Sequence, residues 1–408
     1  MSYYLGDKSI DEVLAKSIET KHPDLLLQHQ KLVEIPDLTH FTWVNRLNLG
    51  NNKITHINKQ LFPPNVKILE IYQNKITHLS NNDIPDSIEE LNAVCNDIKY
   101  FDGTDCLNLK KLYINTNNIC YFRFPPNVIS VDISGNKLTN INDFPKSLKK
   151  IDCSSNQITC FNKLNDGLEK IDFTDNNFRV FPIFPFSVLS IIGNDNMISE
   201  ISELPNGLDK LEMKNCNIYD IQCVLPQSLT VLNLSDNLLT EIPDLPFYIE
   251  DVDISSNRIE ILKEIPDKVQ ILNISDNYIS DIPKELLKRE DLIFNYHNNM
   301  INYDTDYDTD YNDIADYNTD YNTAYKFNDN DVDFSSVWSS DYNHSFYERN
   351  RQNQYDNLPI NQYTGSNFIT YFDDTSVTST SSTSIISNKS KNNNPHYVSI
   401  NNKNKVIV

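Results

Sequence analysis

Three aspartates, Asp132, Asp152 and Asp172, recur at a constant interval of 20 residues. Each lies in a short stretch where apolar and polar residues alternate, which is the pattern of a β-strand. If these strands stack, their carboxylates lie about 4.8 Å apart and repel each other unless a cation or a lysine is near. Lys150 and Lys170 stand two residues before two of the aspartates, and Lys210 has the same place further on. The pattern predicts a mixed-charge stripe for a basic ligand, or alternatively a solvated face of repeat-consensus polar residues.

Equivalent positions in other strands carry side chains that suit protein binding. Arginine and tyrosine dominate binding hot spots, which favours Arg46, Tyr72 and Tyr113 as anchors, although exposed tyrosines without a role are ordinary. The whole predicted protein-binding surface comprises Arg46, Glu70, Tyr72, Tyr113, Asp132, Asp152, Asp172, Glu212, Lys214 and Asp253.

Catalytic and metal-binding patterns are weak by comparison. His56 and His78 share one repeat position, with Cys160 several units away, and a metal site would need more ligands. Cys153 is expected in the core and Cys216 at a structural position, neither with a visible base to activate it. Nucleophile-elbow, P-loop and HExxH spacings are absent from the sequence. We therefore expect no enzyme activity, no cofactor and no metal.

A repeat positions all of these side chains. Its landmark is an asparagine that returns every 19 to 22 residues, replaced once by cysteine. The twelve landmarks are Asn52, Asn74, Asn96, Asn117, Asn136, Asn156, Asn176, Asn196, Cys216, Asn237, Asn257 and Asn277. Counted from the landmark, positions −8, −5, −3, +2 and +5 are apolar throughout, with Gly193 the one residue that has no hydrophobic side chain.

One short strand per unit implies a parallel sheet that grows by stacking. The landmark amide is expected to bond to backbone groups of the next turn, which would otherwise be unpaired at the bend. A proline recurs at position −11, for example Pro226 and Pro246, so the outer side of each turn should be extended or polyproline-like rather than helical.

The stretch PQSLTVLNLSDNLLTEIPDLP, residues 226–246, resembles leucine-rich repeats of the short, proline-containing type found in effectors of pathogenic bacteria. The Asn/Ile-rich composition resembles versions from amoebal giant viruses and AT-rich protists. The resemblance covers about residues 25–300 and implies a repeat solenoid, a curved horseshoe with a parallel β-sheet on its concave face and an irregular convex side. Those effectors often carry a ubiquitin-ligase domain with a cysteine nucleophile, whereas no cysteine follows Cys223 here.

The ends of the repeat array need covers, because a terminal unit exposes its core. Residues 9–20 predict a capping helix that starts with a Ser9–Glu12 capping box and packs through Ile10, Val13, Leu14 and Ile18. A degenerate first unit follows near Leu25 and Leu27, and a short helix over 283–290 precedes a last decayed unit near Asn298. The predicted domains are a cap over 1–24, a solenoid of about 12–14 repeats over 25–300, and a low-complexity, acidic and Ser/Thr-rich tail over 301–408 that is expected to be disordered.

Composition limits the partners. The formal net charge of −22 disfavours nucleic acid and anionic membranes and suits a basic protein partner. The start of the sequence lacks the layout of a signal peptide, and no apolar run is long enough to span a membrane, so an intracellular, cytoplasmic monomer is expected. We predict a non-catalytic interaction scaffold. The alternatives are an adaptor that selects substrates for a ubiquitin or kinase signalling enzyme, and, less favoured, an enzyme with a catalytic tail.

Overall fold

The computed structural model describes residues 9–301. The tail predicted from residue 301 onward lies outside these residues, except for Ile301 itself. Fourteen strands, each of three residues, form one parallel sheet whose order follows the chain. They are β1 (Asp24–Leu26), β2 (Arg46–Asn48), β3 (Ile68–Glu70), β5 (Glu90–Asn92), β7 (Lys111–Tyr113), β9 (Ser130–Asp132), β10 (Lys150–Asp152), β11 (Lys170–Asp172), β12 (Ser190–Ile192), β14 (Lys210–Glu212), β16 (Val231–Asn233), β17 (Asp251–Asp253), β18 (Ile271–Asn273) and β19 (Ile293–Asn295).

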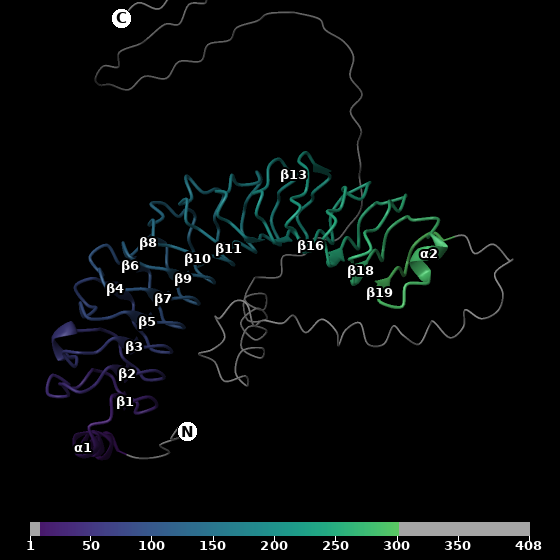
Figure 1. Ribbon diagram of the computed structural model, residues 1–408. Coiled ribbons are helices and arrows are strands. Elements are labelled where there is room, and N and C mark those ends of the chain that lie inside the picture. The colour runs from purple at the N-terminus through teal and green to yellow at the C-terminus, as the bar shows by residue number, and fades with distance from the viewer. Residues whose placement is uncertain (1–8, 302–408) are drawn as a thin grey trace, which may run out of the picture. The chain divides into compact units, whose positions relative to one another are not determined.

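The long sheet lines the inner, concave side of an arc, and the remaining short strands lie on its outer side (Figure 1). Every strand pairs in perfect register with the next, so that repeat position −5 always faces position −5 of its neighbour, as Leu211 faces Leu232. This register follows from the repeat, because a slip of one residue would turn the apolar side chains of a whole strand into solvent. The predicted solenoid with its concave parallel sheet is therefore confirmed.

The five apolar repeat positions build one continuous core along the arc. At position −5 all twelve side chains are 2% exposed or less, as Leu47 and Leu232 illustrate with 0% each. Phenylalanines thicken the middle of this core, where Phe173 packs against Phe178 and Phe184 with ring centroids 4.9 and 6.1 Å apart. Each unit thus buries its apolar face only against its two neighbours, the packing that makes a solenoid.

Gly193, the exception at position −3, is explained by those phenylalanines. A Cβ atom at residue 193 would lie 2.3 Å from Cζ of Phe173 and 2.8 Å from Sδ of Met213. The neighbours of this glycine therefore occupy the volume that a side chain fills in the other units.

We expect Gly193→Ala to lower the free energy of unfolding by about 1–3 kcal/mol, since overpacking forces side chains off their rotamers. In the variant Gly193→Ala/Phe173→Leu the smaller neighbour should remove most of the overlap, so the two substitutions should cost less together than the sum of their separate costs. Urea denaturation of the wild type, both single variants and the double variant measures this coupling. Additive costs would show that Phe173 does not fill the space over Gly193.

The landmark asparagines form a buried ladder of hydrogen bonds. The Asn156 amide Nδ2 donates to the carbonyl oxygens of Ile133 (3.1 Å), Cys153 (3.1 Å) and Ser154 (3.0 Å), and its Oδ1 accepts from the Leu138 N–H (3.0 Å). The other asparagines repeat this pattern, as Asn277 does with Ile254. The ladder was predicted, but its direction was wrong: each amide reaches back to the preceding turn rather than to the next one.

Cys216 occupies one landmark position in this ladder. Its thiol contacts the carbonyl oxygens of Gly193 (3.3 Å) and Lys214 (3.4 Å), two of the acceptors that an asparagine amide would serve. Burial raises the pKa of this thiol to about 12. The cysteine is therefore a neutral structural residue rather than a nucleophile.

The outer side of the turns is mostly extended. Between β1 and β18 the described outer segments contain one 3-10 turn, η1 (Lys59–Leu61), and no α-helix. Short strands pair there in two small parallel sheets: β4 (His78–Ser80), β6 (Tyr100–Asp102) and β8 (Tyr121–Arg123) form one, and β13 (Glu200–Ile201) and β15 (Asp220–Ile221) form the other. The prolines at position −11 account for this, because proline fixes φ and lacks an N–H.

A helix lies near each end of the repeat array, although the second is shorter than the predicted 283–290. Helix α1 (Ile10–Thr20) is capped by Ser9, whose Oγ accepts from the Glu12 N–H, and it buries Val13 near β1. Ile18, expected on the same face, is instead 58% exposed. At the other end helix α2 (Lys284–Leu287) precedes β19, and the last landmark is Asn299, next to Asn298, near which the last unit was expected.

Candidate protein-binding surface

The predicted row of aspartates is present on the concave sheet. Asp132 at the end of β9 is the register partner of Asp152 at the end of β10, which in turn pairs with Asp172 at the end of β11. Tyr113 precedes the row and Ile192 follows it, so an aromatic and an aliphatic side chain bound it on the neighbouring strands. We call Asp132, Asp152 and Asp172 the acidic row.

Each carboxylate of the acidic row is held by its own strand. The Ser134 N–H and hydroxyl donate to Oδ1 of Asp132 at 3.0 and 2.7 Å, and Ser154 makes the same two bonds to Asp152 at 2.9 and 2.7 Å. The Thr174 N–H donates to Asp172 at 2.9 Å. A side chain at position −4 thus caps the N–H two residues later, which fixes the carboxylate on the concave surface.

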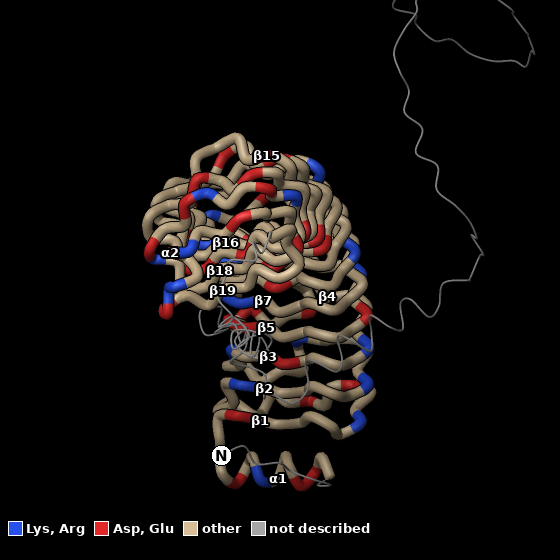
Figure 2. Tube along the Cα trace, turned by 90° about the vertical axis from the view of Figure 1, so that its right-hand side faces the viewer, with Lys and Arg blue, Asp and Glu red and all other residues tan. Residues whose placement is uncertain are grey.

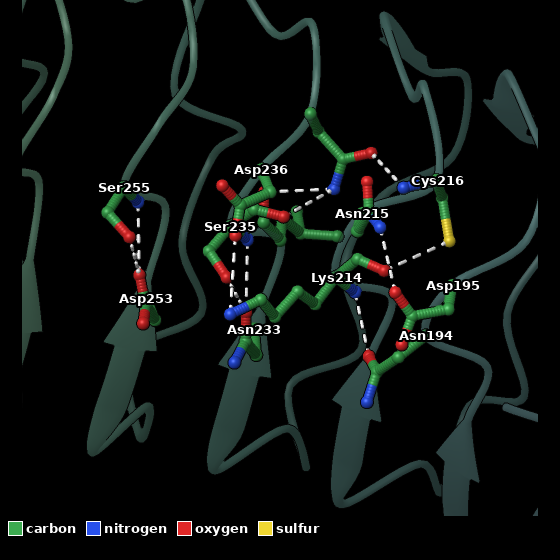
Figure 3. A network of polar contacts seen from close by, with 12 residues as sticks. Asn194, Asp195, Lys214, Asn215, Cys216, Asn233, Ser235, Asp236, Asp253 and Ser255 are labelled. Atoms are coloured by element: carbon green, nitrogen blue, oxygen red, sulfur yellow. Dashed lines mark hydrogen bonds and ion pairs between the residues drawn. The ribbon is translucent and has the colours of Figure 1, made fainter. Parts of the chain in front are cut away.

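The cap does not require a charge. Asn233 accepts from the Ser235 N–H (3.0 Å) and hydroxyl (2.8 Å), and Asn273 accepts from Ser275 in the same way. Figure 3 shows the neutral and charged forms on adjacent strands, with Asn233 and Ser235 beside Asp253 and Ser255. Backbone capping therefore explains an oxygen at position −4 but not three consecutive negative charges.

The acidic row sits in an environment that disfavours its charge. Burial raises the pKa of Asp132, Asp152 and Asp172. Repulsion from Asp152 raises the pKa values of Asp132 and Asp172 further, while the bonds from Ser134 and Thr174 act in the opposite direction. Three like charges on adjacent strands of a concave sheet share little water, so a positive partner would stabilise their ionised forms.

The predicted anchors near the N-terminus are less exposed than the sequence suggested. Arg46 forms a two-pronged ion pair with Glu70, with contacts of 3.1 and 2.9 Å, and Glu70 is only 4% exposed. Tyr113 is 9% exposed, and the ring of Tyr72 covers Gly50, where a Cβ atom would lie 2.3 Å from its Cζ. The expectation that Tyr113 and Glu70 are exposed is corrected, because packing against the adjacent strands covers these two side chains. The side chain of Arg46 is 41% exposed, and Gly50 at position −2 leaves room for the ring of Tyr72.

A second group of charged residues lies on β14 and β17 and in the turns that follow β14 and β16. Lys210 pairs with Glu212 (3.0 Å), which is 9% exposed, and the exposed Lys214 pairs with Asp236 (3.3 Å). Burial, then repulsion from Asp253 and Glu212, raises the pKa of Asp251 to about 6. Glu212, Lys214 and Asp253 were predicted from the sequence, but Asp251, at position −6 in the same strand as Asp253, was not.

Charges of both signs alternate along the stacked turns (Figure 2). The mixed pattern comes from ion pairs between neighbouring units, such as Lys67 with Glu89 (2.7 Å) and Lys149 with Glu169 (2.8 Å). These two pairs are well exposed and contribute little to stability. The acidic row differs from this pattern, because its three negatively charged residues occupy the same repeat position on three adjacent strands.

The histidines and cysteines considered for metal binding or catalysis do not come together in one site. His56 and His78 each contact the threonine before them, at 2.8 and 3.2 Å. Within residues 9–301 no three histidine, cysteine or acidic side chains converge in a way that could hold a metal ion. All seven cysteines are free thiols, and burial raises the pKa of Cys153 well above its usual range. In the same residues no helix is long and apolar enough to cross a bilayer.

The comparisons with known proteins identify the repeat. The family described as Leucine Rich Repeat matches residues 228–249. No curated protein sequence matches the chain. Among solved structures, YopM from Yersinia enterocolitica is 26% identical with a TM-score of 0.58, covering 71% of this chain and 67% of that one.

Two more structures have the same fold at lower identity. A leucine-rich-repeat protein of Leptospira interrogans is 22% identical with a TM-score of 0.56, covering 71% of this chain and 82% of that one. The functional domain of InlJ from Listeria monocytogenes is 20% identical with a TM-score of 0.56, covering 65% and 60%. These likenesses and the observed sheet establish a leucine-rich-repeat solenoid.

Proposed function

We propose that this chain is a non-catalytic scaffold, monomeric by itself, that binds a basic protein partner on its concave face. The acidic row is the observation that carries this proposal. Asparagine performs the same backbone cap at Asn233 and Asn273, so three charged residues in succession add repulsion without adding structure. A lysine- or arginine-rich surface would offset that repulsion, and this gain is a source of affinity that the free chain lacks.

Other residues of the concave face extend the proposed binding surface around the acidic row. Tyr113 borders the row through Asp132, its register partner, and the Arg46–Glu70 pair with Tyr72 forms a rigid patch nearer the N-terminus. Glu212, Lys214 and Asp253 extend the surface past Ile192. Rigid aromatic and paired polar groups lose little conformational freedom on binding, which favours their use as contacts. YopM from Yersinia pestis, which has this fold, is described as a leucine-rich effector protein.

The experiment is affinity capture with the full chain and with the triple variant Asp132→Asn/Asp152→Asn/Asp172→Asn. The variant keeps every cap and removes three charges, so it should fold like the wild type. We expect proteins that the wild type captures at low salt to be lost with the variant, with basic proteins prominent among them. A matched control, Asp244→Asn, removes an exposed charge from the outer side and should capture the same proteins as the wild type. Equal capture by the triple variant would contradict the proposal.

A further inference from the structure

The two ends of the concave sheet differ. At the N-terminal end helix α1 lies next to β1 and buries Val13. At the C-terminal end β19 is the last strand of the sheet, and it pairs with β18 on one side only (Figure 1). No helix or strand follows β19 within residues 9–301. The C-terminal edge of the sheet is therefore open in the part of the chain that the structure describes.

The apolar core is open at the same end. Phe294, at position −5 of the last unit, is only partly buried, whereas the side chains at this position in the twelve units before it are 2% exposed or less. Ile301 at position +2 is also partly buried, and Met300 beside it is 60% exposed. The unit that ends a solenoid exposes its core in this way until another segment covers it.

Backbone groups at this end lack the partners that the repeat provides elsewhere. In the unit before, the Asp276 N–H donates to the carbonyl oxygen of His297 (2.9 Å). The equivalent Asn298 N–H has no backbone acceptor within residues 9–301. The carbonyl oxygen of Leu292 has no backbone donor there either, whereas its counterpart in Gln270 accepts from the first residue of β19 (2.8 Å). An edge of this kind can take one more strand, whose N–H and C=O groups complete the ladder.

The sequence after residue 301 contains one segment that matches the strands of the solenoid. Six strands share the same order of residues from position −5 to position −2: apolar, Asp or Asn, apolar, and Ser or Thr. They have position −5 at Val131, Ile151, Ile171, Leu232, Val252 and Leu272. Between residues 302 and 408 this order occurs once, at Val332-Asp-Phe-Ser. Together with Ser336 this segment is identical to residues 252–256 in four of five positions.

The match covers the strand and not the rest of the unit. Val337 stands where the landmark asparagine would be, and Ser339 stands at position +2. Residues 332–336 can therefore supply a strand and the oxygen that caps the N–H two residues later, but no amide for the ladder. A strand with these properties suits the last position of the array, where no further unit has to stack on it.

We propose that residues 332–336 of this chain bind to the open edge of β19 as an added parallel strand. The register of the repeat places Val332 beside Phe294, with Phe334 two residues further on and on the same buried face. These two side chains cover the open end of the core. In strand addition of this kind the backbone hydrogen bonds supply affinity and the alternate side chains supply specificity.

The occupant follows from where the segment stands in the chain. Residues 302–331 connect it to the last unit, and they are longer than a whole repeat of 19 to 22 residues, which is enough to return to the sheet. A tethered segment is present at a high effective concentration, so it competes well against peptides from other proteins. The added strand also lengthens the concave face, because Asp333 takes position −4 beside Asn295. The inference itself does not rest on the proposed function.

The test compares amide hydrogen exchange in the full chain with exchange in the variant Val332→Asp/Phe334→Asp. In the wild type we expect the edge amides in residues 292–300 and the amides of residues 332–336 to be protected, because local protection follows from hydrogen bonding and burial. In the variant, exchange at both places should become about tenfold faster or more. The matched control Ile369→Asp/Tyr371→Asp places the same charges at the same spacing elsewhere after residue 301 and should exchange like the wild type.

A synthetic peptide of residues 329–342 separates the strand from its tether. Added to Val332→Asp/Phe334→Asp, it should restore slow exchange in residues 292–300. The same peptide with both aspartate substitutions should not restore it.

Three results would overturn the proposal. The first is equal exchange of residues 292–300 in the wild type and in Val332→Asp/Phe334→Asp, and the second is an equal acceleration by the control variant. The third comes from sedimentation of the wild type: a dimer that Val332→Asp/Phe334→Asp dissociates would assign the added strand to a second copy. The acidic row is intact in all of these variants, so capture of basic proteins tests the proposed function separately.

Discussion

Leu232→Ala is expected to lower the free energy of unfolding by about 2–5 kcal/mol, the usual cost of truncating a fully buried leucine. Leu232 is 0% exposed in β16 and faces Leu211 and Val252 in register. The cavity cannot close by moving one strand, because each strand is held on both sides by its neighbours. Unfolding should begin in the units around β16, since each unit of a solenoid depends on the adjacent ones.

Urea denaturation followed by circular dichroism measures this cost. Ile261→Ala is the matched control, because Ile261 is 75% exposed and its truncation should change stability by less than about 0.5 kcal/mol. A midpoint for Leu232→Ala equal to that of the wild type would mean that position −5 is not the core position.

The acidic row should make the fold less stable as pH rises from about 4 to 8. A carboxyl whose pKa is higher in the folded than in the unfolded chain binds its proton more tightly when folded, so its charge destabilises the fold at pH values above the unfolded pKa. Each pKa unit of difference corresponds to about 1.4 kcal/mol. The triple variant Asp132→Asn/Asp152→Asn/Asp172→Asn should therefore be more stable than the wild type at pH 8.

Thermal unfolding of both proteins between pH 4 and pH 8 checks this prediction. The difference in melting temperature should be small near pH 4, where the aspartates are protonated, and should grow as pH rises. Comparing the two proteins cancels the contributions of the other titrating groups. If the variant were less stable at pH 8, the three charges would be stabilising and the raised pKa values of the row would be wrong.

The sequence predicted the fold well because the repeat length determines which residues lie next to each other in space. A residue type that returns every 20 residues must stack on itself, so the columns of Leu232 and Asn156 gave the core and the ladder directly. The direction of the ladder could not be predicted, because the side-chain amide of a landmark asparagine could reach the preceding or the following turn. The position of the strand's end, which decides between them, is known only from the structure. The glycine at position 193 could not be explained from the sequence, because it is the ring of Phe173 and the sulfur of Met213 that leave no room for a side chain there.

The surface was harder to predict for a physical reason. Strand alternation marks Tyr113 and Glu70 as outward-facing, but the exposure of a side chain depends on its neighbours in the adjacent strands, and both are buried. The caps on the acidic row could have been found, since serine or threonine follows each of its aspartates by two residues.

The most direct test of the concave-face account measures how fast the captured partner associates with the chain at rising salt concentrations. For the wild type we expect a rate that falls steeply with salt, because dissolved ions screen the attraction between the acidic row and an approaching basic partner over about 8–10 Å. Reversing the row to Asp132→Lys/Asp152→Lys/Asp172→Lys should slow association at low salt and remove that dependence. A reversed variant whose association rate and salt dependence equal those of the wild type would contradict the account and place the interface elsewhere.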